Sequence, residues 1–205
     1  MTNSNPFLIQ TQKNVTVKNP DEKSWVFEVG KDGDLQVDFL QITDDLSVLV
    51  TLVDERAKCK INCAYLTNKN NKLNIDIKVL HKYKNTTSEQ HIKGIVTDES
   101  SVSFKGVVEI PKSSQKCDGR QHHRGLVLSP KAKIEAIPQL EIWADDVVCS
   151  HGSAIGPLDV NQLFYLQTRG IDEHTAKKIL LSSFLGDLMP EAFSDIIQKW
   201  MDENA

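Results

Sequence analysis

The chain has 205 residues, enough to bury the core of one domain with a small appended subdomain. Its formal net charge of -4 leaves no overall basic footprint of the kind that nucleic-acid-binding proteins carry. The chain has no run of 18 apolar residues, and its N-terminal segment lacks the basic start and long apolar core of a signal peptide. We therefore expect a cytoplasmic protein.

The four cysteines, Cys59, Cys63, Cys117 and Cys149, are too few and too dispersed for a disulfide framework in a chain of this length. Three residues separate Cys59 from Cys63, which is not the two-residue spacing of a zinc knuckle or a redox motif. On a strand the two would share one face. We therefore predict that both are small buried residues with free thiols.

Residues 23 to about 110 consist of short alternating or apolar runs at fairly even spacing, such as SVLVTLV, KINCAYL and SVSFKGVVEI. The segments between them, such as TNKNNK and TDESS, have the composition of solvated turns. This pattern predicts an all-β fold, either an antiparallel sandwich or a stacked solenoid of strands. The scarcity of hairpin dipeptides and the lack of any helical segment across more than a hundred residues favour the solenoid.

Residues 81–130 contain His81, His91, His122 and His123, and we interpret most of these as surface or core packing residues. His122 and His123 would alternate in direction on a strand, so at most one of them faces a given surface. Cys117 precedes Cys149 by one or two coils of a solenoid. One arrangement of the coils that we consider places the two thiols in a stack, near each other.

The stretch from Pro138 to Gly170 starts as a strand and ends as a capped helix, with Cys149, Ser150 and His151 just before the change. On an extended chain the thiol and the imidazole point the same way, where they could bind a soft metal or activate a thiolate. The alternative is a small buried cysteine followed by a hydrogen-bonded turn histidine, and the pair by itself favours this alternative.

Asp145 and Asp146 are adjacent, so on a strand they point to opposite faces and form no paired-carboxylate site. We interpret them as turn or interface residues. The sequence has no GxxxxGK[ST], GxSxG or HExxH motif, so we expect no ATP hydrolysis by this chain alone.

Three short amphipathic helices are predicted after Gly156. Asp159 caps the first, Asp172 caps the second, and Pro190 opens the third. We expect this bundle to cover one end of the solenoid in part. Its large apolar side chains are numerous for so short a segment, which leaves surface for a partner; they are Phe164, Tyr165, Phe193, Trp200 and Met201.

The run LEIWADDVVCSHGSAIGPLD, followed by LFYLQTRGI, resembles the C-terminal core of the SufB/SufD family of iron-sulfur cluster assembly proteins, and its CSHG form resembles the SufD side. Similarity continues through SSQKCDGRQHHRGLVLSP upstream and DEHTAKKILLSSFLGDLMPE downstream. The resemblance implies a mostly β chain: a right-handed parallel β-helix over residues 1–157, then a small helical subdomain over residues 158–205. In the family the segment around Gln115 is coil-forming framework.

The resemblance also implies a function, that of a non-catalytic scaffold that pairs with a SufB-like subunit and docks a SufC-like ATPase. His151 would lie at the subunit interface where a transient iron-sulfur cluster forms, with Cys149 as an auxiliary metal ligand, and the partner would supply the missing ligands. The chain itself would bind no nucleotide. The residues carried over for ATPase docking are Phe164, Tyr165, Arg169 and Gly170.

Family members are typically much longer, with an N-terminal helical region, so this SufD-like chain is shortened and its sulfur-delivery surface is in doubt. Two other hypotheses stay open at this stage. One is a β-helix enzyme that acts on carbohydrate, and the other is a homodimeric interaction protein without metal chemistry. A homodimer is also expected of the scaffold when its partner is absent, because an unpaired solenoid end recruits a like edge.

Overall fold

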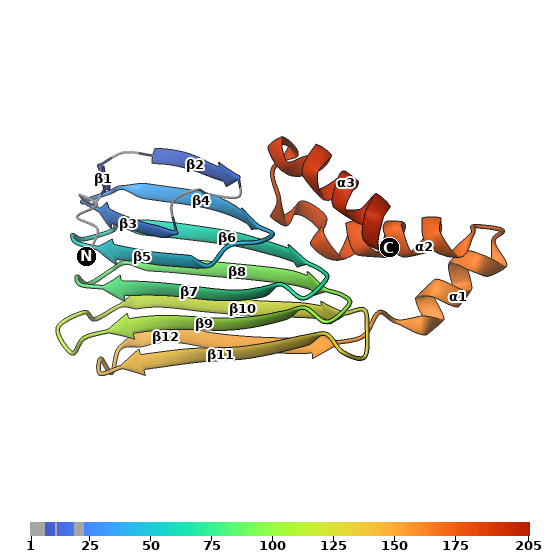
Figure 1. The fold of residues 1–205 in the computed structure, drawn as a ribbon. Coiled ribbons are helices and arrows are strands. Elements are labelled where there is room, and N and C mark those ends of the chain that lie inside the picture. The colour runs from blue at the N-terminus through green and yellow to red at the C-terminus, as the bar shows by residue number, and fades with distance from the viewer. Residues whose placement is uncertain (1–6, 11, 19–22) are drawn as a thin grey trace.

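A computed structural model describes residues 7–10, 12–18 and 23–205 of the chain. In this part, strands β1 to β12 form two six-stranded sheets in which every recorded strand pair is parallel, and helices follow at the C-terminus (Figure 1). The prediction of a parallel β-helix is confirmed, and the antiparallel sandwich is wrong. The β-helix predicted for residues 1–157 includes residues 1–6, 11 and 19–22, which lie outside the described part.

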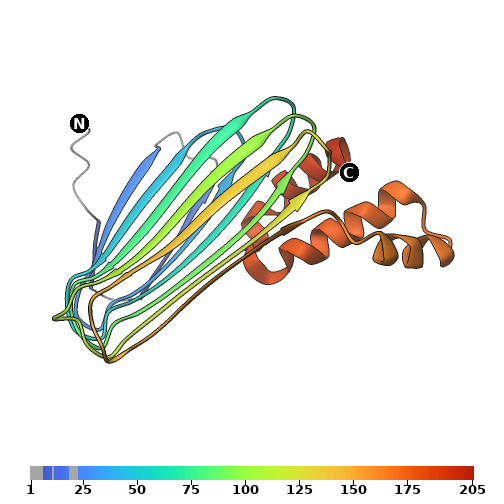
Figure 2. The same ribbon diagram turned by 90° about the horizontal axis from the view of Figure 1, so that it is seen from below.

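Successive strands alternate between the sheets, so each pair of strands makes one coil of the solenoid (Figure 2). Sheet A contains β1 (Phe7–Ile9), β3 (Ser24–Val29), β5 (Leu46–Leu52), β7 (Lys72–His81), β9 (Ser101–Ile110) and β11 (Lys133–Ile142). Sheet B contains β2 (Gln12–Lys18), β4 (Asp34–Gln41), β6 (Lys58–Thr67), β8 (Thr87–Val96), β10 (Cys117–Val127) and β12 (Val147–Gly156).

The turns at one end of the coils repeat a single backbone feature. Between a strand of sheet A and the next strand of sheet B, a non-glycine residue has φ between 56° and 59° in four successive turns. These residues are Asp32, Arg56, Asn85 and Lys116. A left-handed residue reverses the chain within few positions, which lets the strands of successive coils stay in register.

The space between the sheets is filled by alternate side chains of each strand, as the period of two requires. The largest cluster is apolar and includes Phe27, Phe39, Tyr65 and Phe104, all 1 % exposed or less. Cys59 and Cys63 are buried in it, so the prediction for these two thiols is confirmed. Burial raises the pKa of the Cys63 thiol to about 12, so this thiol stays protonated.

The predicted helices are present as α1 (Val160–Thr168), α2 (Glu173–Leu185) and α3 (Ser194–Asn204). Asp159 Oδ1 accepts from Asn161 N at 2.9 Å, and Asp172 Oδ1 accepts from Thr175 N at 3.0 Å, so both predicted N-caps are confirmed. The third helix starts later than predicted. Pro190 precedes a short 3₁₀ turn, η2 (Glu191–Phe193), and η1 (Gly186–Leu188) follows α2.

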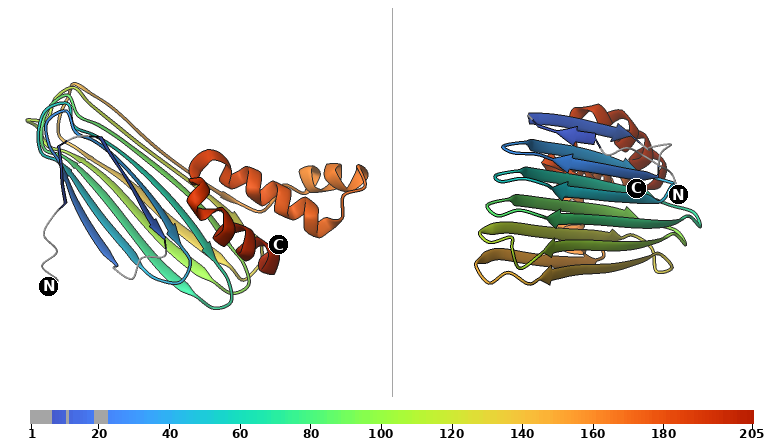
Figure 3. Two further views of the ribbon diagram at one scale, coloured as in Figure 1. Left: turned by 90° about the horizontal axis from the view of Figure 1, so that it is seen from above. Right: turned by 90° about the vertical axis from the view of Figure 1, so that its left-hand side faces the viewer.

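The helices lie along the flank of the solenoid and leave its ends open, contrary to the expectation that they cover an end (Figure 3). Leu181, Leu185, Phe193, Trp200 and Met201 pack on the outer face of sheet B, where an apolar patch interrupts the polar surface. This patch consists of Leu40, Ala64, Leu66 and Ile95. The sequence periodicity predicts Ala176, Ile179, Leu180 and Phe184 as the apolar stripe of the second helix, but Ile179 is 42 % exposed, so the observed stripe of α2 differs.

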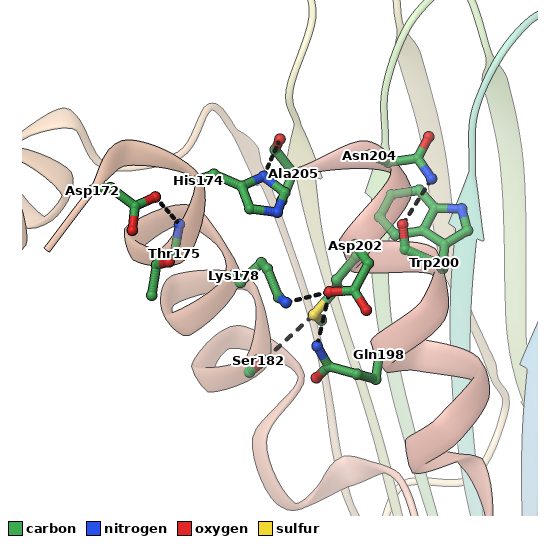
Figure 4. Close-up of polar contacts among 11 residues, drawn as sticks. Asp172, His174, Thr175, Lys178, Ser182, Gln198, Trp200, Asp202, Asn204 and Ala205 are labelled. Carbon is green, nitrogen blue, oxygen red and sulfur yellow. Dashed lines mark hydrogen bonds and ion pairs between the residues drawn. The ribbon is translucent and has the colours of Figure 1, made fainter.

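Polar contacts then join α2 to α3 along their shared side (Figure 4). Lys178 forms an ion pair with Asp202, which also accepts from Gln198 Nε2 at 3.1 Å. Asn204 Nδ2 donates to the carbonyl of Trp200 at 2.7 Å. Of these contacts the Lys178–Asp202 pair joins the two helices and the other two lie within α3, whereas burial against sheet B holds both helices in place.

Candidate functional site

The last coil of the solenoid, made of β11 and β12, is open on one side. β11 is the terminal strand of sheet A and β12 is the terminal strand of sheet B, so each pairs with one neighbour only (Figure 1). Along the other edge of both strands the backbone N–H and C=O groups have no strand beside them. Such an edge is a template for pairing with another chain.

Register places Cys149 and His151 on the inward face of this last coil. Gly119 aligns with Cys149, Gln121 with His151 and His123 with Ser153. The three β10 residues are buried in the interior, and aligned residues of parallel neighbours point to the same side of a sheet. The prediction that the thiol and the imidazole share one face is consistent with this register. His151 is nevertheless exposed, because no further coil covers it.

Cys149 lies beside Gly119 of the preceding coil, and the missing side chain of this glycine leaves room for the thiol. A Cβ on Gly119 would meet the Cys149 Sγ at 3.5 Å, His81 Nε2 at 3.7 Å and a Val108 methyl at 2.9 Å. Burial is the main cause that raises the pKa of the Cys149 thiol, and the nearby Cys117 thiol adds to it, whereas a hydrogen bond from the Gly119 backbone acts against it. The half-buried Cys149 is therefore a protonated thiol at neutral pH.

Cys117 and Cys149 belong to one cluster, so these two thiols of successive coils lie near each other. Cys117 is 1 % exposed and its Sγ lies 3.2 Å from Thr86 Oγ1 and 3.3 Å from the carbonyl oxygens of Tyr83 and Ser114. Cys117 is thus held in the protein interior, while Cys149 reaches the open coil.

Beneath His151 the interior contains two stacked glutamines. Gln121 Nε2 donates to Gln90 Oε1 at 2.8 Å, and Gln90 Nε2 donates to the Val107 carbonyl at 3.5 Å. Both side chains are 0 % exposed. The Oε1 atom of Gln121 is buried and makes no hydrogen bond. An acceptor without a partner therefore lies in the coil directly before that of His151.

A second polar chain runs through the interior from Tyr65 to the last coil. The Tyr65 hydroxyl lies 2.8 Å from His123 Nε2, and His123 Nδ1 lies 3.0 Å from Ser153 Oγ. The His123 ring also stacks on Phe104, with 5.0 Å between ring centroids. Burial lowers the pKa of His123 to about 4, so the imidazole is neutral at physiological pH. The predicted packing role of His123 is confirmed.

Gly94 makes room for this chain, because a Cβ there would lie 1.8 Å from two atoms of the Tyr65 ring. His81 forms a further buried contact set, with Nδ1 at 2.8 Å from Thr86 Oγ1 and Nε2 at 2.7 Å from Ser88 Oγ. Burial lowers the pKa of His81 to about 4. The polar groups of the late coils are thus neutral and mostly paired, as buried polar groups must be.

On the outer surface, His122 is exposed and its ring stacks on that of His91 at 5.6 Å between centroids. His122 and His123 therefore face opposite sides, as predicted. Near the open coil, four large apolar side chains are exposed to solvent: Trp143 (58 %), Val148 (62 %), Ile155 (43 %) and Ile137 (40 %). Apolar surface beside unpaired strand edges is typical of a protein–protein contact region.

Asp145 and Asp146 lie in the exposed turn before β12, and Gln115 fixes that turn. The Asp146 backbone N–H donates to Gln115 Oε1 at 2.9 Å, while Gln115 Nε2 donates to the Lys112 carbonyl at 2.9 Å. The framework role expected of Gln115 is confirmed. The two aspartates occupy a turn and do not form a paired-carboxylate site.

The residues predicted for partner docking lie on α1, which projects away from the solenoid (Figure 2). Phe164 is 67 % exposed and Tyr165 57 % exposed, and α1 has no buried residue. The Arg169 guanidinium lies over the Tyr165 ring at 5.2 Å from its centroid, which orders both side chains. Gly170, with φ of 84°, ends the helix as predicted.

Within residues 7–10, 12–18 and 23–205, no three His, Cys, Asp or Glu side chains are grouped so that they could hold a metal ion. In the same part of the chain, no helix is both long and apolar enough to span a membrane. His151 and Cys149 are brought to one open coil. They lie on β12, the element directly before α1, and α1 itself lies beyond the ends of the strands (Figure 1).

Sequence reasoning missed the interior polar residues around this coil, namely Tyr65, Ser88, Gln90, Gln121 and Ser153. A signal for them exists in the chain. Aligned residues of neighbouring coils are 29 to 31 positions apart in the later strands, as for Ser88, Gly119 and Cys149. Superposing the sequence on itself at that offset would have aligned Gln90 with Gln121 and His151.

Comparison with known proteins agrees with this geometry. Residues 27–184 match the family model described as SUF system FeS cluster assembly, SufBD core domain. The chain is 33 % identical over 141 residues to the iron-sulfur cluster assembly protein SufD of Escherichia coli, which covers 69 % of this chain and 33 % of that protein. It is 34 % identical over 120 residues to SufD of Bacillus subtilis, covering 58 % of this chain and 27 % of that protein.

A third relative is the chloroplastic protein ABCI7 of Arabidopsis thaliana, 42 % identical over 113 residues, covering 55 % of this chain and 24 % of that protein. The chain thus spans a third or less of the length of these three relatives. Its match to the family model covers well over half of the chain and includes the coil that carries Cys149 and His151. The chain therefore belongs to the SufBD core family of SUF-system iron-sulfur cluster assembly proteins, and it is SufD-like.

Proposed function

We propose that this chain is a scaffold subunit of iron-sulfur cluster assembly that pairs through its open coil with a SufB-like subunit and docks a SufC-like ATPase through α1. The observation that supports this most is the open coil itself. It combines unpaired strand edges, an exposed imidazole and a half-buried thiol on one face. The chain then contributes position and ligands and performs no catalytic step of its own.

Pairing would occur by strand addition to β11 and β12, with Trp143 and Val148 buried in the contact. Backbone edges supply hydrogen bonds without side-chain specificity, whereas a large aromatic residue supplies much of the affinity. Co-expression with a SufB-like protein, followed by mass measurement of the purified complex, tests the pairing. We expect a heterodimer, and Trp143→Ala should weaken it by at least tenfold.

The matched control is Tyr83→Ala, which removes a similarly exposed aromatic ring from a turn of an earlier coil. This variant should pair as the wild type does. If the chain stays monomeric in the presence of the partner, the pairing proposal is wrong. If it forms only homodimers, the alternative of a self-pairing interaction protein is correct.

His151 and Cys149 would supply ligands to a nascent iron-sulfur cluster, which is the cargo of the complex. Two residues along a strand are about 6.6 Å apart, so the two groups reach one cluster more readily than one iron ion. An iron-sulfur cluster generally requires about four ligands, and the partner would complete the set. Cys149 must lose its proton to bind iron, and iron binding drives that loss.

Anaerobic reconstitution with iron and sulfide in the presence of the SufB-like partner tests the ligand roles. His151→Ala should lower the amount of cluster formed, whereas His122→Ala should not. His122 is the matched control because it is an exposed histidine of the preceding coil that faces the outer side. Equal cluster formation in the two variants would remove His151 from the site.

Docking of the ATPase is proposed for the exposed side of α1. Phe164 and Tyr165 are adjacent exposed aromatic residues on a helix that has no fully buried residue, so they offer apolar surface to a partner. The double variant Phe164→Ala, Tyr165→Ala should lose binding to a SufC-like ATPase while keeping the thermal stability of the wild type. Ile179→Ala, which removes an exposed apolar residue from α2, is the control.

A further inference from the structure

The buried glutamines form a ladder with a defined direction. Gln90 uses its amide N–H to reach the Val107 carbonyl, so its Oε1 is the acceptor for the next coil. Gln121 fills that acceptor with its own Nε2. Gln121 thus donates to the coil before it, and the acceptor of Gln121 is left for the coil that follows.

Residues that the register aligns on one face of a sheet form a column. His151 is the residue of the last coil in the column that contains Gln90 and Gln121. Register aligns Gln90 with Gln121 and Gln121 with His151 on the same face of sheet B. The Gln121 Oε1 atom is buried, makes no hydrogen bond and belongs to a side chain that is 0 % exposed. A buried acceptor of this kind is costly unless a donor reaches it, so its place directly before an imidazole calls for a function.

We propose that Gln121 is a positioning residue for His151, whose ring N–H donates to Gln121 Oε1 when the imidazole turns toward the interior. A neutral imidazole has one N–H and one lone pair on opposite nitrogens. Donation to Gln121 therefore fixes the tautomer and directs the lone pair outward, toward the open coil. Metal-binding histidines are commonly held by such a hydrogen bond from the second nitrogen.

The ladder explains why the column changes from apolar to polar residues. Val37 and Ile61 occupy the same column in the earlier coils, where they serve the apolar core. Gln90 and Gln121 replace them where the column approaches the open coil. An apolar residue at position 121 would pack equally well but would offer no acceptor to the imidazole.

The use of this tautomer in cluster assembly rests on the proposed function, whereas the hydrogen bond itself can be tested on the isolated chain. The chain is labelled with ¹⁵N-histidine and the ring nitrogens are observed by two-bond proton–nitrogen correlation at pH 8. His151→Ala identifies the His151 signals. We expect His151 in one tautomer in the wild type, in contrast with the tautomer mixture of the exposed His122 in the same spectrum.

Gln121→Met keeps the length of the side chain and removes the acceptor, so His151 should revert to the mixture seen for His122. Gln162→Met, on the exposed surface of α1, is the matched control and should leave the spectrum unchanged. A tautomer mixture for His151 in the wild type would overturn the proposal even if Gln121→Met fails to fold. An unchanged single tautomer in a folded Gln121→Met chain would overturn it as well.

The result is distinguishable from a failure of the proposed function. If the chain binds no SufB-like partner but His151 shows one tautomer that depends on Gln121, the positioning role stands and the assembly role does not. If the partner binds, Gln121→Met should also lower cluster formation, and Gln162→Met should not.

Discussion

The early and late coils of the solenoid have the same backbone but different interiors. In sheet B, the inward positions of β4 and β6 hold only apolar residues over the columns that end at the open coil: Leu35, Val37, Phe39, Cys59, Ile61 and Cys63. In β8, β10 and β12 the same columns hold mainly polar or glycine residues: Ser88, Gln90, Gly119, Gln121, His123, His151 and Ser153. Ile92 and Cys149 are the exceptions.

The early coils therefore serve mainly stability, and the late coils serve mainly the positioning of side chains. Apolar side chains stabilise the early coils through burial, which has no direction. Hydrogen-bonded side chains in the late coils have defined donors and acceptors, so they orient what lies above them, at the risk of unpaired buried groups. The polar side chains beneath the last coil therefore orient the side chains of that coil, which include His151 and Cys149.

The largest expected effect is on the apolar core of the early coils. Phe39 is 0 % exposed and packs in the main core, with Trp25 edge-on at 6.1 Å between ring centroids. Phe39→Ala should lower the free energy of unfolding by about 3–5 kcal/mol, measured by urea denaturation, because it leaves a cavity between the sheets. Phe39→Leu should cost clearly less. Equal losses for the two variants would show that the early coils tolerate cavities.

The fold was accessible from the sequence, for reasons that this core makes clear. Alternating β-branched and aromatic residues at even spacing predict strands, and the absence of helical segments up to Gly156 favours a solenoid. Coil register was not deduced, because it depends on how many residues each turn takes up, and the offset between aligned residues varies from 29 to 31 in the later coils. Without the register, Gln121 and His151 are 30 residues apart and unrelated, although aligned coils place them in one column.

The placement of the helices was also beyond the sequence. Periodicity identified the apolar residues Phe193, Trp200 and Met201, and all three are buried. Consecutive apolar residues break the alternation at the receiving patch, as at Leu66 of β6 and Ile95 of β8, but this break did not show which helices cover the outer face of sheet B. The distinction between the buried α3 and the exposed aromatic residues of α1 required the coordinates.

The second prediction concerns how the stability of the chain depends on pH through the buried histidines of the late coils. The pKa of His123 is about 4 in the folded chain, below the ordinary value of 6.5. Below pH 6.5 the unfolded chain binds a proton that the folded chain does not, so the free energy of unfolding falls as pH falls toward 4. The difference of about 2.5 pH units corresponds to about 3 kcal/mol.

His123→Phe isolates this contribution, because all other groups titrate equally in the two proteins. The stability advantage of the wild type over His123→Phe should shrink between pH 6.5 and pH 4 in parallel urea titrations. A constant difference over this range would mean that His123 is not held neutral. His81, whose pKa is also about 4, predicts a contribution of the same sign.

The third prediction tests whether the polar chain acts as a pair. Tyr65→Phe leaves His123 Nε2 without its partner, and His123→Phe leaves the buried Tyr65 hydroxyl without one. Each single variant should lose about 1–3 kcal/mol at pH 7, since an unsatisfied buried group bears its full desolvation cost. The double variant should lose less than the sum, because no orphaned group remains. Additive losses would contradict a direct hydrogen bond.

The smallest expected effect compares two serines on the inward face of sheet B. Ser88 is 0 % exposed and lies 2.7 Å from His81 Nε2, whereas Ser153 is exposed in the last coil and lies 3.0 Å from His123 Nδ1. Ser88→Ala should lower the free energy of unfolding by about 1–3 kcal/mol, because His81 Nε2 loses its partner away from water. Ser153→Ala should change it by about 0.5 kcal/mol or less, since water replaces the hydroxyl at an open edge. If Ser153→Ala cost as much as Ser88→Ala in the same urea titration, the last coil would be covered in solution, by a second copy of the chain or by a fold that closes it.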